Sequence, residues 1–248
     1  MRFFGGALDR GRIQSSAGAT AIYSGLDYGV FNIGMLDGRS CSGIEDFEAR
    51  LASCARFFIP RTSRWSFWLC EDLVDRAALR EIRGLMQDRD FRLISQAPGM
   101  VAPLLAPPVR PIPLIECHPV NDRATREAFA RITSESFDIP NSVAKAVYEP
   151  ERAWLGDYRG FVGSAAGKII ATVAVVAAGD ALGIYSLATV AEYRRRGYGE
   201  ALLRSAIAAE RERTGLNTVI LQSTEAGYSM YKRIGFREVT KFSVYLTK

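Results

Sequence analysis

The sequence predicts a mixed α/β fold with a mostly antiparallel central sheet in its second half, preceded by a smaller N-terminal α/β domain. Three observations predict this. The length of 248 residues suits one large or two small domains. Strand-like and helix-like apolar patterns alternate along the second half, with short turns between successive strands. A segment with five prolines in twelve residues, 102–113, separates the two halves.

The proline-rich segment is the predicted domain boundary. Proline fixes φ and lacks an amide hydrogen, so the segment is unsuited to a helix or a central strand. Leu104, Leu105 and Ile112 are apolar, so we expect the segment to pack as a connector rather than to move freely. The predicted domains are residues 1–105 and residues 111–248.

The second half is predicted to follow the order βααβββαβαβ. Asn121 or Asp122 offers a side-chain cap to the first helix, and Gly215 follows the third as a helix-ending residue. The apolar run Thr218–Gln222 is typical of a central parallel strand. The elements are a strand over 112–117, helices over 121–136 and 142–148, strands over 158–164, 169–178 and 181–190, a helix over 197–213, a strand over 218–222, a helix over 226–234 and a strand over 236–247.

The first half contains fewer clear signals. Apolar spacing predicts helices over 45–57 and 73–88, and strands over 64–70 and 91–94. Trp65 and Trp68 lie in the first of these strands and are expected in the core, although an aromatic wall of a substrate pocket is an alternative. This half shows no catalytic signature.

Composition excludes several classes of function. The net charge of +5 comes from 32 basic and 27 acidic residues, without the concentrated patch of a nucleic-acid binder. Four cysteines without a C-x-x-C pair, and a single histidine, argue against a metal site. We expect buried or partly buried thiols in a reducing compartment. No stretch resembles a signal peptide or is long enough for a membrane span, so we expect a cytoplasmic protein without membrane partners.

The stretch Ser186–Leu203 carries the most chemical information. It reads as a strand, a basic loop with two glycines, and the start of a helix. The glycines permit a tight turn and a close ligand approach, and free amides at a helix start attract anions. Arginines add charge-assisted hydrogen bonds, so the stretch suits a pyrophosphate. The alternative is a solvated basic loop with a glycine at the helix start.

Other nucleotide motifs fail on spacing. A G-x-G-x-x-G fingerprint would need glycine at position 202, which is leucine, and no acid follows at the ribose position. A phosphate loop would need Gly-Lys-Ser/Thr, and this stretch has none.

Arg194-Arg195-Arg196-Gly197-Tyr198-Gly199 fits the R/Q-x-x-G-x-G/A signature of the GNAT N-acetyltransferase superfamily. The stretch from Ser223 to Phe236, which ends Tyr-Lys-Arg-Ile-Gly-Phe, resembles the second motif of that family. The resemblance covers roughly residues 111–248 and implies the GNAT acyl-CoA N-acyltransferase fold. Ala191 departs from the pattern, because many members carry proline there.

The resemblance implies acetyl-CoA as co-substrate and no metal. Carried over to this sequence, Leu187, Ala188 and Thr189 would contact the pantetheine in a gap between two strands. The pyrophosphate would be held mostly through backbone amides, and Ser223 of the second motif would also contact the cofactor. The residues around the pyrophosphate are Arg194, Arg195, Arg196, Gly197, Tyr198, Gly199 and Glu200.

Tyr231 matches the general acid of the family. A phenol has a pKa near 10, so it is protonated at neutral pH and can donate to the departing CoA thiolate. The alternatives are a core tyrosine, or Tyr228 in the same role. The base that accepts the amine proton is left open between water and a side chain, with Glu225, Tyr185, Glu149 and Glu151 as candidates. His118 is interpreted as a structural or surface histidine.

The N-terminal half contains a weak echo of the second motif. A helix followed by Phe91-Arg92 echoes Ile234-Gly235-Phe236-Arg237. This suggests a degenerate second acetyltransferase-like half that lacks the pyrophosphate loop and walls the acceptor cleft.

The predicted function is transfer of an acetyl group from acetyl-CoA to a primary amine by direct attack in a ternary complex. The acceptor is a small molecule or a peptide that the sequence does not identify. The sequence does not indicate the oligomeric state. Two alternatives stay open: a non-catalytic acyl-CoA-binding regulatory or interaction module, and an enzyme for longer acyl or aminoacyl groups.

Overall fold

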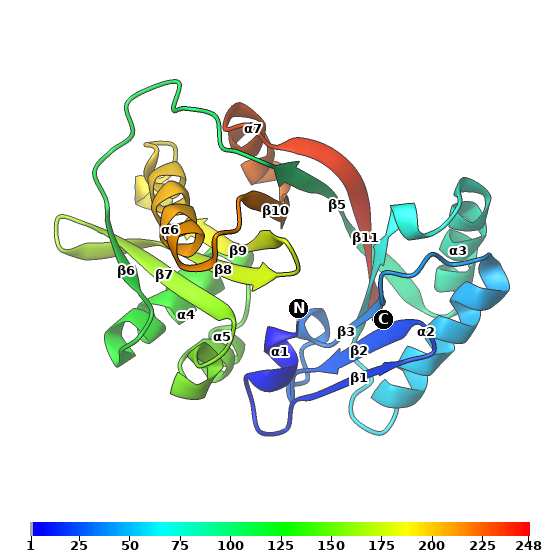
Figure 1. Cartoon of the computed structure of the whole chain (residues 1–248). Coiled ribbons are helices and arrows are strands. Elements are labelled where there is room, and N and C mark those ends of the chain that lie inside the picture. The colour runs from blue at the N-terminus through cyan, green and yellow to red at the C-terminus, as the bar shows by residue number, and fades with distance from the viewer. Residues whose placement is uncertain (1) are drawn as a thin grey trace. The chain divides into compact units, whose positions relative to one another are not determined.

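The computed structural model describes residues 2–248 and divides into two compact units (Figure 1). Unit 1 contains the described residues up to Gly99 together with Glu238–Lys248, and unit 2 is Met100–Arg237. The division by contacts thus gives the end of the chain to unit 1. The domain limits expected from the sequence, 1–105 and 111–248, stay a prediction.

Unit 2 is built on a mixed sheet of β6 (Glu116–Pro119), β7 (Tyr158–Ala165), β8 (Lys168–Ala178), β9 (Ala181–Thr189) and β10 (Thr218–Gln222). The strand order is β10-β9-β8-β7-β6. All neighbours are antiparallel except β10, which runs parallel to β9. The predicted hairpins at 165–168 and 179–180 and the predicted parallel strand are confirmed, and so is the mixed, mostly antiparallel fold class.

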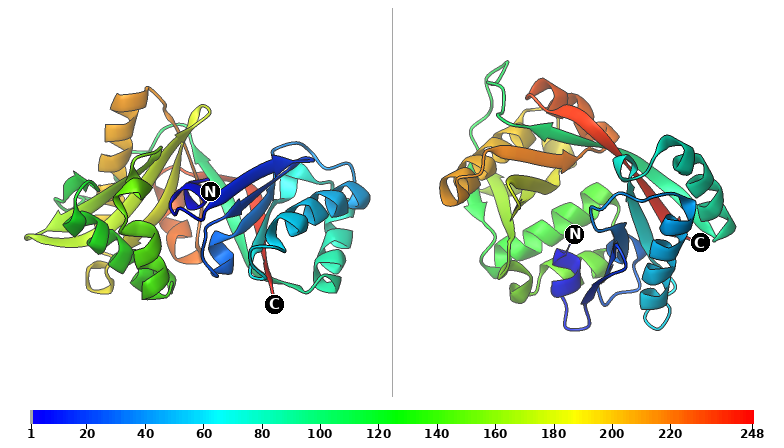
Figure 2. Two further views of the ribbon diagram at one scale, coloured as in Figure 1. Left: turned by 90° about the horizontal axis from the view of Figure 1, so that it is seen from below. Right: turned by 45° about the vertical axis from the view of Figure 1, so that its right-hand side comes forward.

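Helices cover both faces of this sheet. Figures 1 and 2 show α6 (Tyr198–Thr214) on one face, with α4 (Arg123–Phe137) and α5 (Asn141–Tyr148) on the other. Asp122 caps α4 by accepting the Thr125 amide at 2.8 Å, as the sequence indicated. Leu202, Leu203 and Ala206 of α6 are fully buried against the sheet. The remaining helix, α7 (Glu225–Arg233), follows β10.

Within unit 1 the strand order is β1-β2-β3-β4-β11. Strands β3 and β4 are parallel, and the other neighbours are antiparallel. Its core includes Phe47, Phe67 and Ile82, and Trp65 is buried there as predicted. The same prediction is wrong for Trp68, which is only half-buried and donates its indole N–H to the Ser66 hydroxyl at 3.0 Å. The elements are α1 (Phe3–Gly6), β1 (Arg12–Ser16), β2 (Ala19–Tyr23), β3 (Ile33–Leu36), α2 (Ile44–Phe58), β4 (Ser66–Cys70), α3 (Arg76–Asp88), β5 (Phe91–Ala102) and β11 (Arg237–Thr247); β5 enters unit 2 at Met100.

The two halves of the chain repeat one order of elements. In the first half, three antiparallel strands β1–β3 are followed by α2, by β4 parallel to β3, by α3 and by β5. In the second half, β7–β9 are followed by α6, by β10 parallel to β9, by α7 and by β11. The echo noticed at Phe91-Arg92 therefore extends over a whole set of strands and helices.

Several predicted boundaries are wrong. The strand expected over 112–117 pairs only from Glu116 onward, because Pro111 and Pro113 cannot donate to a ladder. The helix expected from residue 73 begins at Arg76, where Asp75 caps it. The strand expected over 91–94 continues to Ala102, and β1, β2 and β3 were not predicted.

The four cysteines are free thiols, two buried and two half-buried, as expected. Burial raises the pKa of the Cys117 thiol to about 11. Among residues 2–248, no helix is both long and apolar enough to cross a membrane. Within the same residues, no group of three or more His, Cys, Asp or Glu side chains is placed to hold a metal ion.

Candidate functional site

A cavity of about 790 Å³ lies within unit 2. It is formed by the C-terminal end of α4, the end of β9, the loop and first turn of α6, α7, and one residue of the proline-rich segment. The lining residues are Arg110, Ser136, Phe137, Leu187, Ala188, Thr189, Tyr193, Arg194, Arg195, Gly197, Gly199, Glu200, Thr224, Ala226, Gly227, Ser229, Met230, Tyr231 and Arg233. Cavities of this size hold cofactor-sized ligands.

The cavity opens where β10 leaves β9. The paired stretch ends at Leu221 opposite Ile184, and β10 itself ends at Gln222. Strand β9 continues to Thr189, and its other edge stays paired with β8 through Ala188 and Thr189. The last residues of β9 therefore offer one backbone edge to a ligand in the gap that the sequence predicted.

A bulge turns β9 just before the gap. Ser186 has φ +50°, a left-handed conformation, and the β8–β9 register shifts there. The Thr172 hydroxyl donates to the Ser186 carbonyl at 2.9 Å, and the Ser186 hydroxyl lies 2.9 Å from that of Tyr158. These bonds fix the bulge and thereby the direction in which Leu187 enters the cavity.

The start of α6 needs both glycines of the loop. Gly197 is the N-cap, with φ +92°, and a Cβ there would lie 2.9 Å from Cδ of Pro113. A Cβ on Gly199 would lie 3.1 Å from Oγ1 of Thr189. The first amide bonded within the helix is that of Ala201, to the Gly197 carbonyl at 3.0 Å. The three amides before it, at 198–200, are those that a helix start leaves for an anion.

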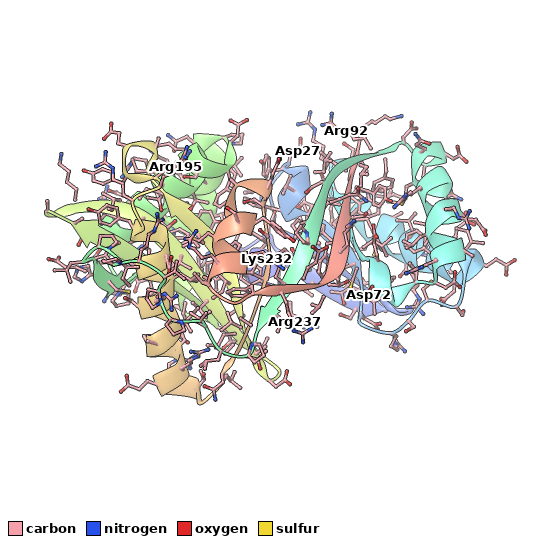
Figure 3. The ribbon with its side chains drawn as sticks, turned by 90° about the horizontal axis from the view of Figure 1, so that it is seen from above. Asp27, Asp72, Arg92, Arg195, Lys232 and Arg237 are labelled. Atoms are coloured by element: carbon pink, nitrogen blue, oxygen red, sulfur yellow. The ribbon has the colours of Figure 1, made fainter. Side chains whose placement is uncertain are left out.

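The three consecutive arginines have different surroundings. Arg194 donates to the Thr189 carbonyl at 2.8 Å and to Ser136 Oγ at 3.4 Å, so it joins the loop to β9 and α4. Arg195, labelled in Figure 3, is exposed, and its guanidinium has no hydrogen bond or ion pair to residues 2–248. Arg196 does not line the cavity, and its guanidinium lies 5.9 Å from the ring of Tyr193. Only Arg195 is therefore a free cation of this loop at the cavity.

Glu200 contributes in a way that the motif does not reveal. Its amide belongs to the first turn of α6, but its buried carboxylate forms ion pairs with Arg204 at 2.9 Å and Arg233 at 3.1 Å. Arg233 is the last residue of α7. The carboxylate therefore ties the start of α6 to the end of α7, which carries Tyr231.

Tyr231 lines the cavity with a nearly buried side chain. Its ring lies against Gly227, where a Cβ would come within 2.7 Å of the ring, and it packs edge-on against Phe236 with ring centres 5.5 Å apart. Burial raises the pKa of its phenol well above 10. The hydroxyl is therefore protonated at neutral pH, as a proton donor must be.

Nine of the twelve residues predicted for the site line this one cavity, and Arg196, Tyr198 and Ser223 do not. The buried Ser223 hydroxyl donates to the Thr224 carbonyl at 2.7 Å. Sequence reasoning missed Arg110, Ser136 and Phe137, because they reach the cavity from segments distant in the chain. The assignment of the predicted residues to acetyl-CoA stays a prediction.

The candidate bases lie outside the cavity. None of Glu225, Tyr185, Glu149 and Glu151 is among the described residues that line it. Glu151 lines a separate cavity of about 270 Å³ beside Trp154. His118 lies on the edge strand β6, 3.5 Å from a carboxylate oxygen of Glu116.

The corresponding positions of the first half are occupied differently. The carboxylate of Asp46, in the first turn of α2, accepts the Ser42 amide at 3.0 Å and pairs with Arg50 at 2.7 Å. The hydrogen bond from Arg50 keeps the pKa of Asp46 well below its usual range. Met86 stands five residues before Phe91, as Tyr231 stands five before Phe236. The first turn of α2 thus carries a carboxylate of its own, bonded to Ser42 and Arg50, and no phenol stands where Tyr231 would be.

Comparisons with known proteins support the resemblance. The family model described as "Acetyltransferase (GNAT) domain" matches residues 156–238. No curated protein matches the chain. The structure is similar to a GCN5-related N-acetyltransferase from Kribbella flavida, with a TM-score of 0.71 at 16% identity over 98% of this chain and 91% of that one.

Two further solved structures share the fold over most of the chain. A functionally unknown conserved protein from Staphylococcus epidermidis has a TM-score of 0.67 at 14% identity, covering 96% of this chain and 94% of that one. A GCN5-related N-acetyltransferase from Sphaerobacter thermophilus has a TM-score of 0.60 at 17% identity, covering 93% of this chain and 76% of that one. Both halves of the chain lie within these matches. Residues 156–238 therefore match the GNAT acetyltransferase domain, and the chain as a whole shares the fold of GCN5-related N-acetyltransferases.

Proposed function

We propose that the chain is an N-acetyltransferase that moves an acetyl group from acetyl-CoA to a primary amine. One observation carries the proposal: a single cavity brings together the free edge of β9, the bare start of α6 and the phenol of Tyr231. The match of residues 156–238 to the GNAT domain supports acyl transfer in general. The acceptor is proposed to be a small-molecule or peptide amine, and the protein is proposed to act in the cytoplasm.

The residues of the cavity fit acetyl-CoA. The amides of Tyr198, Gly199 and Glu200 suit its diphosphate, because no bond within the helix uses them. Arg195 adds a free positive charge at the same place. The backbone edge of Leu187–Thr189 suits the two amides of the pantetheine arm, and an amide of β9 can polarise the thioester carbonyl.

The reaction needs one bond to form and one to break. The neutral amine attacks the thioester carbonyl carbon, and the tetrahedral intermediate then loses the CoA sulfur as a thiolate. Tyr231 donates its phenolic proton to that sulfur and regains a proton from solvent. The amine must also lose one proton when it becomes an amide. None of the four candidate bases lines the cavity, so we assign the acceptance of this proton to water.

Two measurements test this proposal. Isothermal titration with acetyl-CoA is expected to show binding, and free thiol is expected to be released when members of an amine panel are added. Binding without thiol release for any amine would favour the alternative, a non-catalytic acyl-CoA-binding module. Absence of acetyl-CoA binding would contradict the proposal itself.

A further inference from the structure

The proline-rich segment brings one cation to the cavity that the loop before α6 does not supply. Arg110 lines the cavity, although it lies more than eighty residues before that loop. Its side chain is exposed, and among residues 2–248 its guanidinium has no hydrogen bond or ion pair. Arg110 is thus a cation fixed at a ligand cavity with no protein partner for its charge.

Anchors on both sides fix the position of Arg110. Before it, the amide of Ala106 donates to the Ile234 carbonyl at 2.9 Å, and its carbonyl accepts Arg204 at 2.7 Å. After it, Pro113 lies on Gly197, the N-cap of α6. Four prolines between 107 and 113 restrict the chain between these anchors, so the segment is held rather than free.

The anchor at Pro113 limits how far Arg110 lies from the start of α6. Three residues of extended chain span at most about 11 Å. Arg110 therefore lies near the diphosphate site but does not belong to the loop that forms it. A long, planar side chain at this distance reaches a neighbouring group of the same ligand.

Acyl-CoA carries two separate anionic groups, the diphosphate and a 3′-phosphate one ribose away. The cavity offers two free guanidiniums, on Arg195 and Arg110. Arg195 stands beside the amides that suit the diphosphate, which leaves Arg110 for the second anion. A phosphate monoester carries nearly two charges at neutral pH and accepts paired hydrogen bonds from a guanidinium.

We propose that Arg110 binds the 3′-phosphate of acyl-CoA, so that the proline-rich segment makes the site select CoA over its dephospho form. This inference rests on the proposed function, because it deepens the assignment of the same cavity. The segment predicted only as a domain connector thereby becomes part of the ligand site.

Titration of two ligands against matched variants tests the inference. Acetyl-CoA and acetyl-dephospho-CoA are titrated at one ionic strength into the wild type, Arg110→Gln, Arg195→Gln and Lys168→Gln. The wild type is expected to bind acetyl-CoA about 10-fold more tightly than the dephospho ligand, as suits a charge-assisted contact. Arg110→Gln is expected to bring the ratio of the two dissociation constants close to one, because it weakens the binding of acetyl-CoA and leaves that of acetyl-dephospho-CoA unchanged.

The other variants define the controls. Arg195→Gln is expected to weaken both ligands by a similar factor and so keep the ratio. Lys168→Gln, at the exposed first residue of β8, removes one charge outside the cavity and is expected to change neither affinity. Arg110→Lys, which keeps the charge but not the planar fork, is expected to retain part of the ratio.

The outcomes separate this inference from the proposed function. An unchanged ratio in Arg110→Gln, equal weakening of both ligands, or a wild type that does not distinguish them would overturn the role of Arg110 and leave the proposed function standing. If the wild type bound neither ligand, the proposed function would fail, and this inference with it.

Discussion

The packing of Tyr231 gives a physical reason for the spacing of Gly227, Tyr231 and Phe236 in the second motif. Gly227 lies four residues before it, one helical turn away, and leaves room for the ring. Phe236 lies five residues after it and packs against the other side. The tyrosine is thus held between two residues of its own motif, and its phenol needs no distant partner to be directed.

Replacing Tyr231 by phenylalanine tests its role as proton donor. We expect Tyr231→Phe to lower kcat by about 100-fold, the lower end for general acid catalysis, because the thiolate must then leave unprotonated. The Kd for acetyl-CoA is expected to change by less than about 3-fold. Steady-state kinetics and titration measure both quantities.

Tyr228→Phe is the matched control, because it removes the same hydroxyl one turn earlier on α7. Its kcat is expected to stay close to that of the wild type. Equal activity of Tyr231→Phe and the wild type, or a large loss only in Tyr228→Phe, would exclude Tyr231 as the acid.

Replacement by alanine is predicted to have different effects on stability at two helical glycines. Gly84 is exposed in α3 with open space around it, so Gly84→Ala is expected to raise the free energy of unfolding by about 0.5–1 kcal/mol. Gly227→Ala must displace the ring of Tyr231, so we expect no gain in stability and a lower kcat. Urea unfolding and kinetics measure both variants. A gain at Gly227 with full activity would contradict the packing described.

At the scale of elements, the two halves use equivalent helix starts for opposite purposes. The start of α6 has glycines and free amides, whereas the carboxylate of Asp46 occupies the first turn of α2. A negative charge is favourable at the positive end of either helix: the chain supplies one at α2, and the proposed function assigns one to the ligand at α6. This difference is the reason that we assign an anion site to α6 and none to α2.

Asp46 gives a prediction about pH. Because Arg50 lowers its folded pKa, its contribution to stability is complete above the unfolded value of about 3.9 and is lost as pH falls toward the folded value. Asp46→Asn is expected to be less stable by about 1–2 kcal/mol at pH 7. The difference from the wild type should shrink between pH 4 and pH 2. Urea unfolding at several pH values measures it, and a constant difference would argue against the ion pair.

The elements with strong local signals were predictable. Asp122 caps α4 and Gly215 ends α6 through interactions within a few residues, and the predicted limits of these helices are close to those observed. Strand β1 is exposed along its whole length, and β5 contains Pro98 and Gly99, so neither shows the alternation that identifies a strand. Their pairing depends on residues distant in the sequence.

At the scale of the whole molecule, the repeated order of elements argues that the chain consists of two related halves. The first half retains the strands and helices but has Asp46 at the helix start and Met86 in place of the tyrosine. The cavity that contains the loop before α6 and Tyr231 is lined by residues of unit 2. Most residues that line the cavity lie within the motif stretch 186–236, and their assignment to acetyl-CoA stays a prediction.

This asymmetry predicts one acetyl-CoA per chain. Isothermal titration is expected to give a stoichiometry near one, because the first turn of α2 carries the Asp46 carboxylate and Met86 stands where Tyr231 would be. Arg195→Gln should weaken that single binding event. Two binding events of similar affinity would show that the first half also holds the ligand.

What the sequence could not provide was the part of the cavity contributed by distant segments. The loop from Arg194 to Gly199 and Tyr231 are local signals, whereas Arg110, Ser136 and Phe137 join them only after folding. Arg110 in particular lies among prolines that predict a connector. Arg110 reaches the cavity because Ala106 and Pro113 are held by contacts with distant residues. No local sequence pattern predicts those contacts.

A crystal structure of the acetyl-CoA complex tests the central claim most directly. The account predicts diphosphate oxygens within about 3.2 Å of the amides at 198–200, pantetheine amides paired with the backbone of Leu187–Thr189, and the thioester sulfur within hydrogen-bond reach of the Tyr231 hydroxyl. A complex in which acetyl-CoA leaves the start of α6 empty, or places its sulfur away from Tyr231, would contradict it.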